Sequence, residues 1–193
     1  MLAGVDEAGR GPLAGPVVAA AVVLPPEAVL PGTDDSKKLS PARRREALEG
    51  IMDTALAVGV GIVDSDEIDR TNILQSALRA MGFALCGLRL KPELALIDGN
   101  RLPPLPASAG YFPLKALVGG DRLSLSVAAA SIVAKCLRDS LMDQWHGRYP
   151  QYRFDRHRGY GTPEHMETLH RYGPCPIHRR TFAPVRALLE TGI

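Results

Sequence analysis

The sequence has few cysteines, no long hydrophobic run and almost no net charge, and each scarcity excludes a class of protein. The three cysteines are widely spaced, so they predict neither a disulfide framework nor a zinc knuckle, and they favour a reducing cytoplasm. No apolar run is long enough to cross a bilayer, and the first residues lack the basic segment that opens a signal peptide. The net charge of +2 is too small to indicate a nucleic-acid-binding protein by itself. With 193 residues, we expect one sizeable core in a cytoplasmic monomer without membrane association.

The small net charge hides an uneven distribution of basic residues. Residues 148–180 contain seven arginines and four of the five histidines, with four tyrosines and a phenylalanine between them. Basic, arginine-weighted segments with aromatic residues are typical of surfaces that follow a phosphate backbone. A solvated surface with tyrosines that extend from the core has the same composition, so composition alone leaves both interpretations open.

The pattern of apolar residues predicts a mixture of strands and helices. Strands are expected at residues 2–6, 17–24, 58–62, 94–98 and 111–118. One helix is expected to start at Pro41 with Ser40 as its cap, and others to cover residues 64–69, 72–88, 126–148, 162–172 and 184–190. Because the strands come early and mix with helices, the class is α/β or α+β, with a central mixed sheet.

Two adjacent acids, Asp6 and Glu7, stand at the end of the first apolar run and are followed by glycines. Adjacent strand residues point to opposite faces, so both carboxylates serve one site only if the strand stops at about Asp6 and the glycines let the chain turn. Two unpaired acids beside a buried strand are costly without a partner or a metal. Oxygen ligands favour Mg²⁺ or Mn²⁺ over zinc, and the Gly9-Arg10-Gly11 segment offers N–H groups and a guanidinium to a phosphodiester.

Two further acids stand at positions where strands end. Asp98 ends the predicted strand at residues 94–98, and Asp121 lies between a strand and the long helix. Four carboxylates at one sheet edge would bind two divalent ions about 4 Å apart, as in-line phosphoryl displacement requires. Taken singly, an Asp beside Gly is more often a turn residue. Asp139 and Asp143 fall within the long helix, where we expect solvent exposure or a salt bridge.

Other site chemistries fit the sequence less well. The glycines after the first strand have the spacing G-x-G-x-x-x-G rather than the dinucleotide-binding G-x-G-x-x-G, and Pro12 interrupts the helix start that such a site needs. His165 and His170 are five residues apart rather than the four of a zinc-binding helix. His178 stands in a short basic run, where it either contacts phosphate or makes a structural hydrogen bond.

Eight short segments carry a more specific pattern. They are residues 4–17 (GVDEAGRGPLAGPV), 35–40 (DSKKLS), 96–100 (LIDGN), 128–135 (AAASIVAK), 138–139 (RD), 149–152 (YPQY), 157–162 (HRGYGT) and 178–182 (HRRTF). In this order they span nearly the whole chain, and together they resemble the type 2 ribonuclease H family, bacterial ribonuclease HII.

The resemblance implies an α/β, ribonuclease H-like fold with a central mixed sheet flanked by helices. Residues 1–145 would form the catalytic domain, and residues 146–193 a small C-terminal helical, basic and aromatic substrate-binding region packed on it. The implied activity is endonucleolytic hydrolysis of the RNA strand in RNA–DNA hybrids with two Mg²⁺ or Mn²⁺ ions. It includes incision on the 5′ side of a single ribonucleotide in duplex DNA, which leaves 3′-hydroxyl and 5′-phosphate ends.

The resemblance also assigns roles to individual residues. The catalytic, metal-binding acids are Asp6, Glu7, Asp98 and Asp121, and the substrate-binding residues are Gly9, Arg10, Gly11, Lys37 and Tyr160. Backbone groups at residues 9–11 are expected to hydrogen-bond the 2′-hydroxyl, the group that separates RNA from DNA. Tyr160 is expected to stack on the adjoining sugar, although a tyrosine between glycines is equally a surface residue. Lys37 is expected to contact phosphate.

Two features depart from the family pattern. Family members often carry lysine just before the fourth acid, and here that position is Gly120. The loop of Asp121 therefore lacks this positive neighbour, so the family pattern predicts the ionisation and metal preference of Asp121 less firmly. The chain ends soon after Val185, without a longer helical tail or a visible clamp-binding sequence. A noncatalytic hybrid-binding module is the remaining alternative, and it should have lost at least one metal-binding acid.

Overall fold

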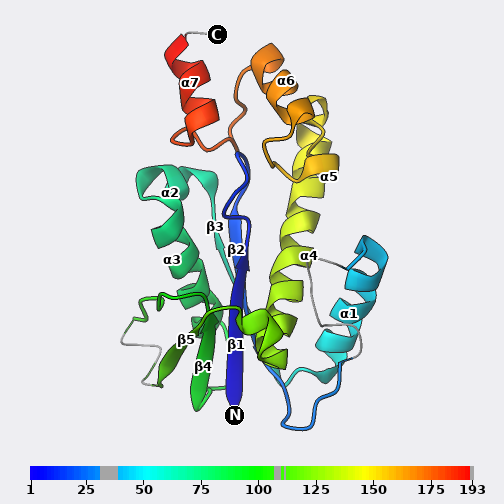
Figure 1. The fold of residues 1–193 in the computed structure, drawn as a ribbon, viewed down its shortest axis with the longest axis vertical. Coiled ribbons are helices and arrows are strands. Elements are labelled where there is room, and N and C mark those ends of the chain that lie inside the picture. The colour runs from blue at the N-terminus through cyan, green and yellow to red at the C-terminus, as the bar shows by residue number, and fades with distance from the viewer. Residues whose placement is uncertain (31–38, 107–109, 111, 192–193) are drawn as a thin grey trace.

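The structure, a computed structural model, describes residues 1–30, 39–106, 110 and 112–191 (Figure 1). Its centre is a five-stranded sheet in the order β3-β2-β1-β4-β5. The strands are β1 (Leu2–Ala8), β2 (Val17–Val23), β3 (Ala57–Val63), β4 (Leu94–Asp98) and β5 (Leu114–Leu117). β2 is antiparallel to both β1 and β3, whereas β1, β4 and β5 run parallel. The predicted central mixed sheet is confirmed.

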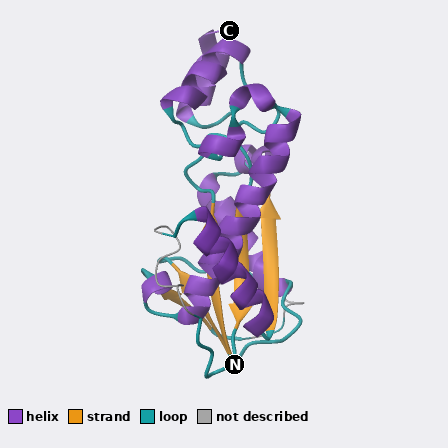
Figure 2. Cartoon of the chain, turned by 90° about the vertical axis from the view of Figure 1, so that its right-hand side faces the viewer, coloured by secondary structure: helices purple, strands orange, loops and turns teal. Residues whose placement is uncertain are grey.

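Helices cover both faces of the sheet and extend beyond one of its ends. They are α1 (Pro41–Thr54), α2 (Ser65–Arg70), α3 (Ile73–Cys86), η2 (Gly120–Arg122), α4 (Leu125–Arg148), η3 (Pro150–Tyr152), α5 (Phe154–His157), α6 (Pro163–Tyr172) and α7 (Ala183–Thr191). Figure 1 shows α3 on one side of the strands and α4 with α1 on the other. The helices α5, α6 and α7 lie beyond the end of the sheet that is opposite the N-terminus (Figure 2).

Alternation along the central strands divides the core into two layers. Val5 and Ala19 belong to the layer that contains the buried face of α3, whereas Ala20 and Val22 face the layer formed with α4. Between β1 and α4 there is room only for a glycine, because a Cβ on Gly4 would overlap the helix backbone at its first turn. This close contact holds β1 against the start of α4, two residues before Asp6.

The helix boundaries follow local capping chemistry. Ser40 Oγ accepts a hydrogen bond from Arg43 N at 3.3 Å, and Thr162 Oγ1 accepts one from His165 N at 3.2 Å. The predicted starts of α1 and α6 are thereby confirmed. The short elements η2, η3 and α5 were not predicted, because none is long enough to show a hydrophobic period.

Two strand predictions need correction. β1 does not stop at about Asp6 but continues through Ala8, because its ladder with β2 extends to the pair Ala8–Val18. β5 covers only Leu114–Leu117 and is shorter than predicted, since Pro113 immediately before it cannot donate a backbone hydrogen bond.

The C-terminal helices are joined to the sheet through the loop between β1 and β2. The Leu13 N–H donates to Gly159 O at 2.8 Å, and the Gly15 N–H donates to Ile177 O at 2.8 Å. The helix α4 runs unbroken across the proposed boundary between residues 145 and 146, and the division of the chain at that point stays a prediction. Within the described part of the chain, no helix is long and apolar enough to cross a membrane.

Candidate active site

Asp6 and Glu7 lie where β1 separates from β4. The β1–β4 ladder ends at Val5, whereas the β1–β2 ladder continues past both acids. Asp6 is only 6% exposed, and its Oδ1 accepts a hydrogen bond from the Glu7 N–H at 2.7 Å. Glu7 Oε1 lies 3.3 Å from the Arg10 guanidinium. Glu7 also lines a cavity with side chains of α4, so it reaches the α4 side of the sheet although the strand does not stop before it.

Asp98 and Asp121 come from the neighbouring part of the sheet. Because β1 and β4 are parallel, their register continued by one residue places Asp98 beside Asp6. Asp98 Oδ1 accepts a hydrogen bond from the Gly120 N–H at 2.8 Å, which joins η2 to the end of β4. Asp121 follows directly in η2. A Cβ on Gly120 would lie 3.4 Å from Asp98 Oδ1, so this position is closely packed against the cluster.

The pKa values show that these carboxylates repel one another. Burial, with the nearby carboxylates of Glu7 and Asp98, raises the pKa of Asp6 to about 8, against a smaller opposing effect of a hydrogen bond with Ser131. Burial also raises the pKa of Glu7, and Arg10 only partly offsets it. Without a cation, Asp6 therefore keeps its proton near neutral pH, because the buried cluster cannot hold the full negative charge of its carboxylates.

The donor chemistry of this cluster suits a hard divalent cation. Carboxylate oxygens are preferred ligands of Mg²⁺ and Mn²⁺, and Glu7 Oε2 is buried with no hydrogen-bond partner among the described residues. Across those same residues, no group of three or more His, Cys, Asp or Glu side chains is so arranged that it could hold a metal ion. The carboxylates would have to rearrange to share an ion, and their repulsion opposes that rearrangement until a cation is present.

A cavity of about 270 Å³ opens beside the acids. Its lining joins one acid to the glycine-rich loop, α4 and the C-terminal region: Glu7, Ala8, Gly9, Arg10, Gly11, Ser131, Lys135, Arg138 and Tyr160. Tyr160 is 44% exposed, and a Cβ on Gly11 would lie 3.6 Å from its ring. Five predicted site residues thus meet around one cavity, although Glu7 and Tyr160 are far apart in the sequence.

Several basic residues of the C-terminal region are not available to a phosphate backbone. His157, His165, His178 and Arg179 are all buried. The phosphate-contact interpretation is therefore wrong for His178, and its structural alternative is confirmed by the hydrogen bond between His178 Nδ1 and the Cys175 N–H at 2.9 Å. Composition could not separate these cases, because it carries no information on burial.

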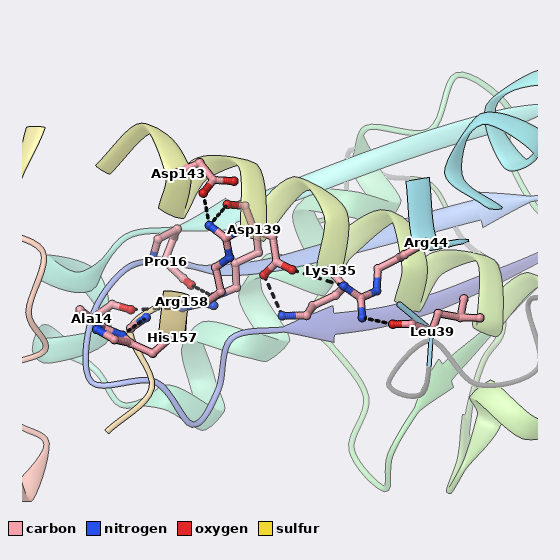
Figure 3. Close-up of polar contacts among 11 residues, drawn as sticks. Ala14, Pro16, Leu39, Arg44, Lys135, Asp139, Asp143, His157 and Arg158 are labelled. Carbon is pink, nitrogen blue, oxygen red and sulfur yellow. Dashed lines mark hydrogen bonds and ion pairs between the residues drawn. The ribbon is translucent and has the colours of Figure 1, made fainter. Parts of the chain in front are cut away.

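The outer face of α4 carries a row of ion pairs (Figure 3). Arg158 pairs with Asp143 and donates to the backbone carbonyl of Asp139 at 3.4 Å. The Asp139 carboxylate pairs with Lys135 at 2.7 Å and with Arg44 of α1 at 3.5 Å. The prediction of salt bridges for Asp139 and Asp143 is confirmed, and these pairs hold Lys135 at the edge of the cavity.

The sequence interpretation missed three cavity residues on α4. Ser131, Lys135 and Arg138 follow one another at helical spacing and all line the cavity. Arg138 is buried, and its Nη1 has no hydrogen-bond partner among the described residues. The available signal was their place in the segments that carry the family resemblance. Lys37 lies outside the described residues.

Comparison with known proteins identifies the family. A model of the family described as Ribonuclease HII matches residues 3–185. The chain is 54% identical to the ribonuclease HII of Syntrophobacter fumaroxidans over 193 residues, which cover 100% of this chain and 81% of that protein. It is 51% identical to the enzyme of Idiomarina loihiensis, over 98% of each. The chain belongs to the ribonuclease HII family.

Solved structures agree with this assignment. The crystal structure of ribonuclease H2 from Pyrococcus horikoshii matches with a TM-score of 0.82 and 30% identity, over 98% of this chain and 97% of that one. The ribonuclease H-like fold prediction is therefore confirmed. Ribonuclease HII proteins are divalent-metal-dependent endoribonucleases that act on RNA–DNA hybrids, so the predicted enzyme class is confirmed and the dinucleotide-binding alternative is excluded.

Proposed function

We propose that Asp6, Glu7, Asp98 and Asp121 hold Mg²⁺ or Mn²⁺, two ions during catalysis, and that the enzyme cuts on the 5′ side of a single ribonucleotide in duplex DNA. The products carry 3′-hydroxyl and 5′-phosphate ends. One observation carries this proposal: a single cavity is lined both by Glu7 and by the Gly9–Gly11 loop and Tyr160. The Glu7 carboxylate and the groups that would contact the ribose can therefore act on neighbouring atoms of the same nucleic-acid strand.

The proposed metal-binding acids differ in the backbone elements that carry them. When bound, divalent ions activate the attacking water and stabilise the leaving 3′-oxygen. Asp6 and Asp98 come from adjacent parallel strands, which gives them rigid backbones, whereas Asp121 comes from the short η2. The Gly120 N–H, which donates to Asp98 Oδ1, orients that carboxylate and joins the loop of Asp121 to it.

The glycine-rich loop has donors available for the 2′-hydroxyl. The carbonyl oxygens of Gly9 and Arg10 already accept hydrogen bonds from Arg179, at 2.6 Å and 2.9 Å. The N–H groups of Arg10 and Gly11 have no such partner among the described residues. The loop therefore presents donors to the cavity, and Tyr160 across from Gly11 provides a ring for the adjoining sugar.

A noncatalytic module that only binds hybrids is the second candidate. It is disfavoured because all four acids are present and because a buried, mutually repulsive carboxylate pair has no use in binding a polyanion. Lys37 remains a proposed phosphate contact on the grounds of the family resemblance alone. The expectation of a cytoplasmic monomer also stays a prediction.

The test is incision of end-labelled duplex DNA that carries one ribonucleotide, with Mg²⁺, with Mn²⁺ and with a chelator. We expect a metal-dependent cut on the 5′ side of the ribonucleotide and none in an all-DNA duplex of the same sequence. Hybrid binding without cleavage in either metal would instead support the noncatalytic module.

A further inference from the structure

One segment, residues 175–179, is linked to both sides of the cavity. Its Arg179 donates to the glycine-rich loop, and its His178 bonds to His165, which in turn bonds to Tyr160 O. We call residues 175–179 the bridging segment. Neither residue lines the cavity, so neither can touch a substrate there.

The loop side is held by a buried guanidinium. Arg179 is 0% exposed and donates to three carbonyl oxygens of the loop: Gly9 O at 2.6 Å, Arg10 O at 2.9 Å and Gly15 O at 2.9 and 3.0 Å. Burial lowers the pKa of Arg179 to about 9, which shows the cost of removing this charge from water. A planar fork can satisfy three separate carbonyls at once, and a lysine ammonium at the end of a flexible chain cannot reproduce that geometry.

The Tyr160 side is held by a directed chain of hydrogen bonds between neutral histidines. The Cys175 N–H donates to His178 Nδ1 at 2.9 Å, so His178 carries its proton on Nε2. His178 Nε2 therefore donates to His165 Nε2 at 3.0 Å, and His165 Nδ1–H donates to Tyr160 O at 2.9 Å. His178 Nδ1 also lies 3.3 Å from Cys175 O, and the shorter contact with the Cys175 N–H favours the Nε2 tautomer. Burial keeps the pKa of both rings low enough that they stay neutral.

The backbone completes the connection between the two sides. Arg179 N donates to Leu13 O at 2.8 Å, Gly15 N donates to Ile177 O at 2.8 Å, and His178 forms an isolated bridge with Ala14. The bridging segment is thus paired with the loop and bonded through His178 to the helix α6 that carries His165. The loop is also joined directly to the turn that carries Tyr160, because the Leu13 N–H donates to Gly159 O at 2.8 Å.

We propose that the bridging segment, together with the direct Leu13–Gly159 bond, sets the distance between the Gly9–Gly11 loop and Tyr160, with Arg179 and His178 as positioning residues of the gap that contacts the ribonucleotide. This inference rests on the proposed function, because it takes that loop and Tyr160 as the groups that contact the ribonucleotide. A displacement of about 1 Å in such a gap is enough to reduce the rate about 10²-fold.

The experiment measures single-turnover incision at one ribonucleotide, well below the melting temperature of every variant. His178→Asn keeps the acceptor for the Cys175 N–H but cannot reach His165, and Arg179→Lys keeps the charge but loses the fork. Each is made alone and with Tyr160→Ala. The matched controls are the exposed His170→Asn and the exposed Arg70→Lys of α2.

We expect His178→Asn to slow incision about tenfold, and to have less than a twofold effect when Tyr160 is already alanine, because it acts only through that residue. Arg179→Lys should slow incision about tenfold or more in both backgrounds, because it acts through the loop. The controls should stay within about twofold.

Two outcomes would overturn the proposal. If His178→Asn slows incision equally with Tyr160 present and in the Tyr160→Ala background, the effect of His178 is a general structural one. If Arg179→Lys leaves the rate unchanged, Arg179 does not position the loop. Should His178→Asn fail to fold, His165→Asn cuts the same link from the other side while it keeps a donor for Tyr160 O. If Tyr160→Ala alone leaves the rate unchanged, the recognition role in the proposed function fails, while the Arg179 variant still tests the loop.

Discussion

The two sides of the cavity differ in how their buried charges are satisfied. On the acidic side, Asp6 and Glu7 repel each other and Glu7 Oε2 has no hydrogen-bond partner among the described residues. On the opposite side, Arg179 is as deeply buried but donates to three carbonyl groups of the loop. The buried carboxylates of the acidic side need a cation to balance their charge. On the side of the glycine-rich loop and Tyr160, which we call the reading side, the hydrogen bonds of Arg179 are already made without a substrate.

This contrast explains which side can tolerate movement. The proposed metal-binding cluster would have to adjust as ions enter, and Asp121 stands on a three-residue 3₁₀ turn rather than on a strand. Under the proposed function, the gap between the Gly9–Gly11 loop and Tyr160 distinguishes ribose from deoxyribose, so it must keep its width, and the bonds of Arg179 and His178 would hold it. The predictions below, ordered from the largest expected effect to the smallest, test each side in turn.

The largest effect is expected from the acidic side. Asp6→Asn removes a metal ligand and should slow incision by about 10³-fold or more, while affinity for a hybrid stays within about threefold because phosphate contacts dominate it. Single-turnover cleavage and fluorescence anisotropy at one salt concentration measure the two quantities. Loss of binding together with activity would show that Asp6 is structural.

The contact that supports both sides is the packing of β1 on α4. Gly4→Ala places a methyl group on the helix backbone, so it should lower the free energy of unfolding by about 3 kcal/mol. Gly147→Ala in α4 is the matched control, because nothing lies within 4 Å of the added carbon, and it should be neutral or stabilise by up to about 1 kcal/mol. Urea unfolding measures both, and equal effects would refute this account of the β1–α4 contact.

On the reading side, Tyr160→Ala should slow incision at a single ribonucleotide about 10- to 100-fold, which is about 1.4–2.8 kcal/mol. The ring is 44% exposed, so the melting temperature should change by only a few degrees. Cleavage kinetics and thermal unfolding of the same preparation distinguish the effects. A collapse in melting temperature with an unchanged rate would make Tyr160 a packing residue.

The last prediction, with no effect at neutral pH, concerns the acid stability of the side of the cavity that carries Tyr160. Burial lowers the pKa of His165 to about 4 and that of His178 to about 3, below the ordinary value of 6.5. The unfolded chain therefore binds more protons, so stability is present above pH 6.5 and is lost as the pH falls from 6.5 towards 4. Each of the two histidines should account for a loss of roughly 2–3 kcal/mol over that interval.

Urea unfolding from pH 7 to pH 4.5 checks this prediction. His165→Asn should reduce the dependence by about half, because His178 still contributes, whereas His170→Asn on the exposed face of the same helix should leave it as in the wild type. A wild-type curve that stays level between pH 6.5 and pH 4.5 would show that the two histidines titrate in the folded state as they do in water.

Local chemistry carried much of the prediction. β4 was predicted at its observed residues, 94–98, because an apolar run ends abruptly in Asp-Gly-Asn, and α6 was predicted from Thr162-Pro163. The four acids were found because carboxylates at strand ends are few, and their assignment as metal ligands stays a prediction. β1 was predicted too short, since its last residues are held by β2, a long-range ladder that local sequence does not encode.

The sequence by itself determined the family, the mixed sheet and the residues that carry the chemistry, because caps, strand ends and ordered motifs are written in neighbouring residues. Only the tertiary structure decided which basic residues are buried and which face the cavity. Arg179 and His178 stand beside the exposed Arg180 in one basic run, and composition treats the three alike. Their roles depend on contacts with residues 9–15 and with His165, because burial and hydrogen-bond direction arise only when distant segments pack together.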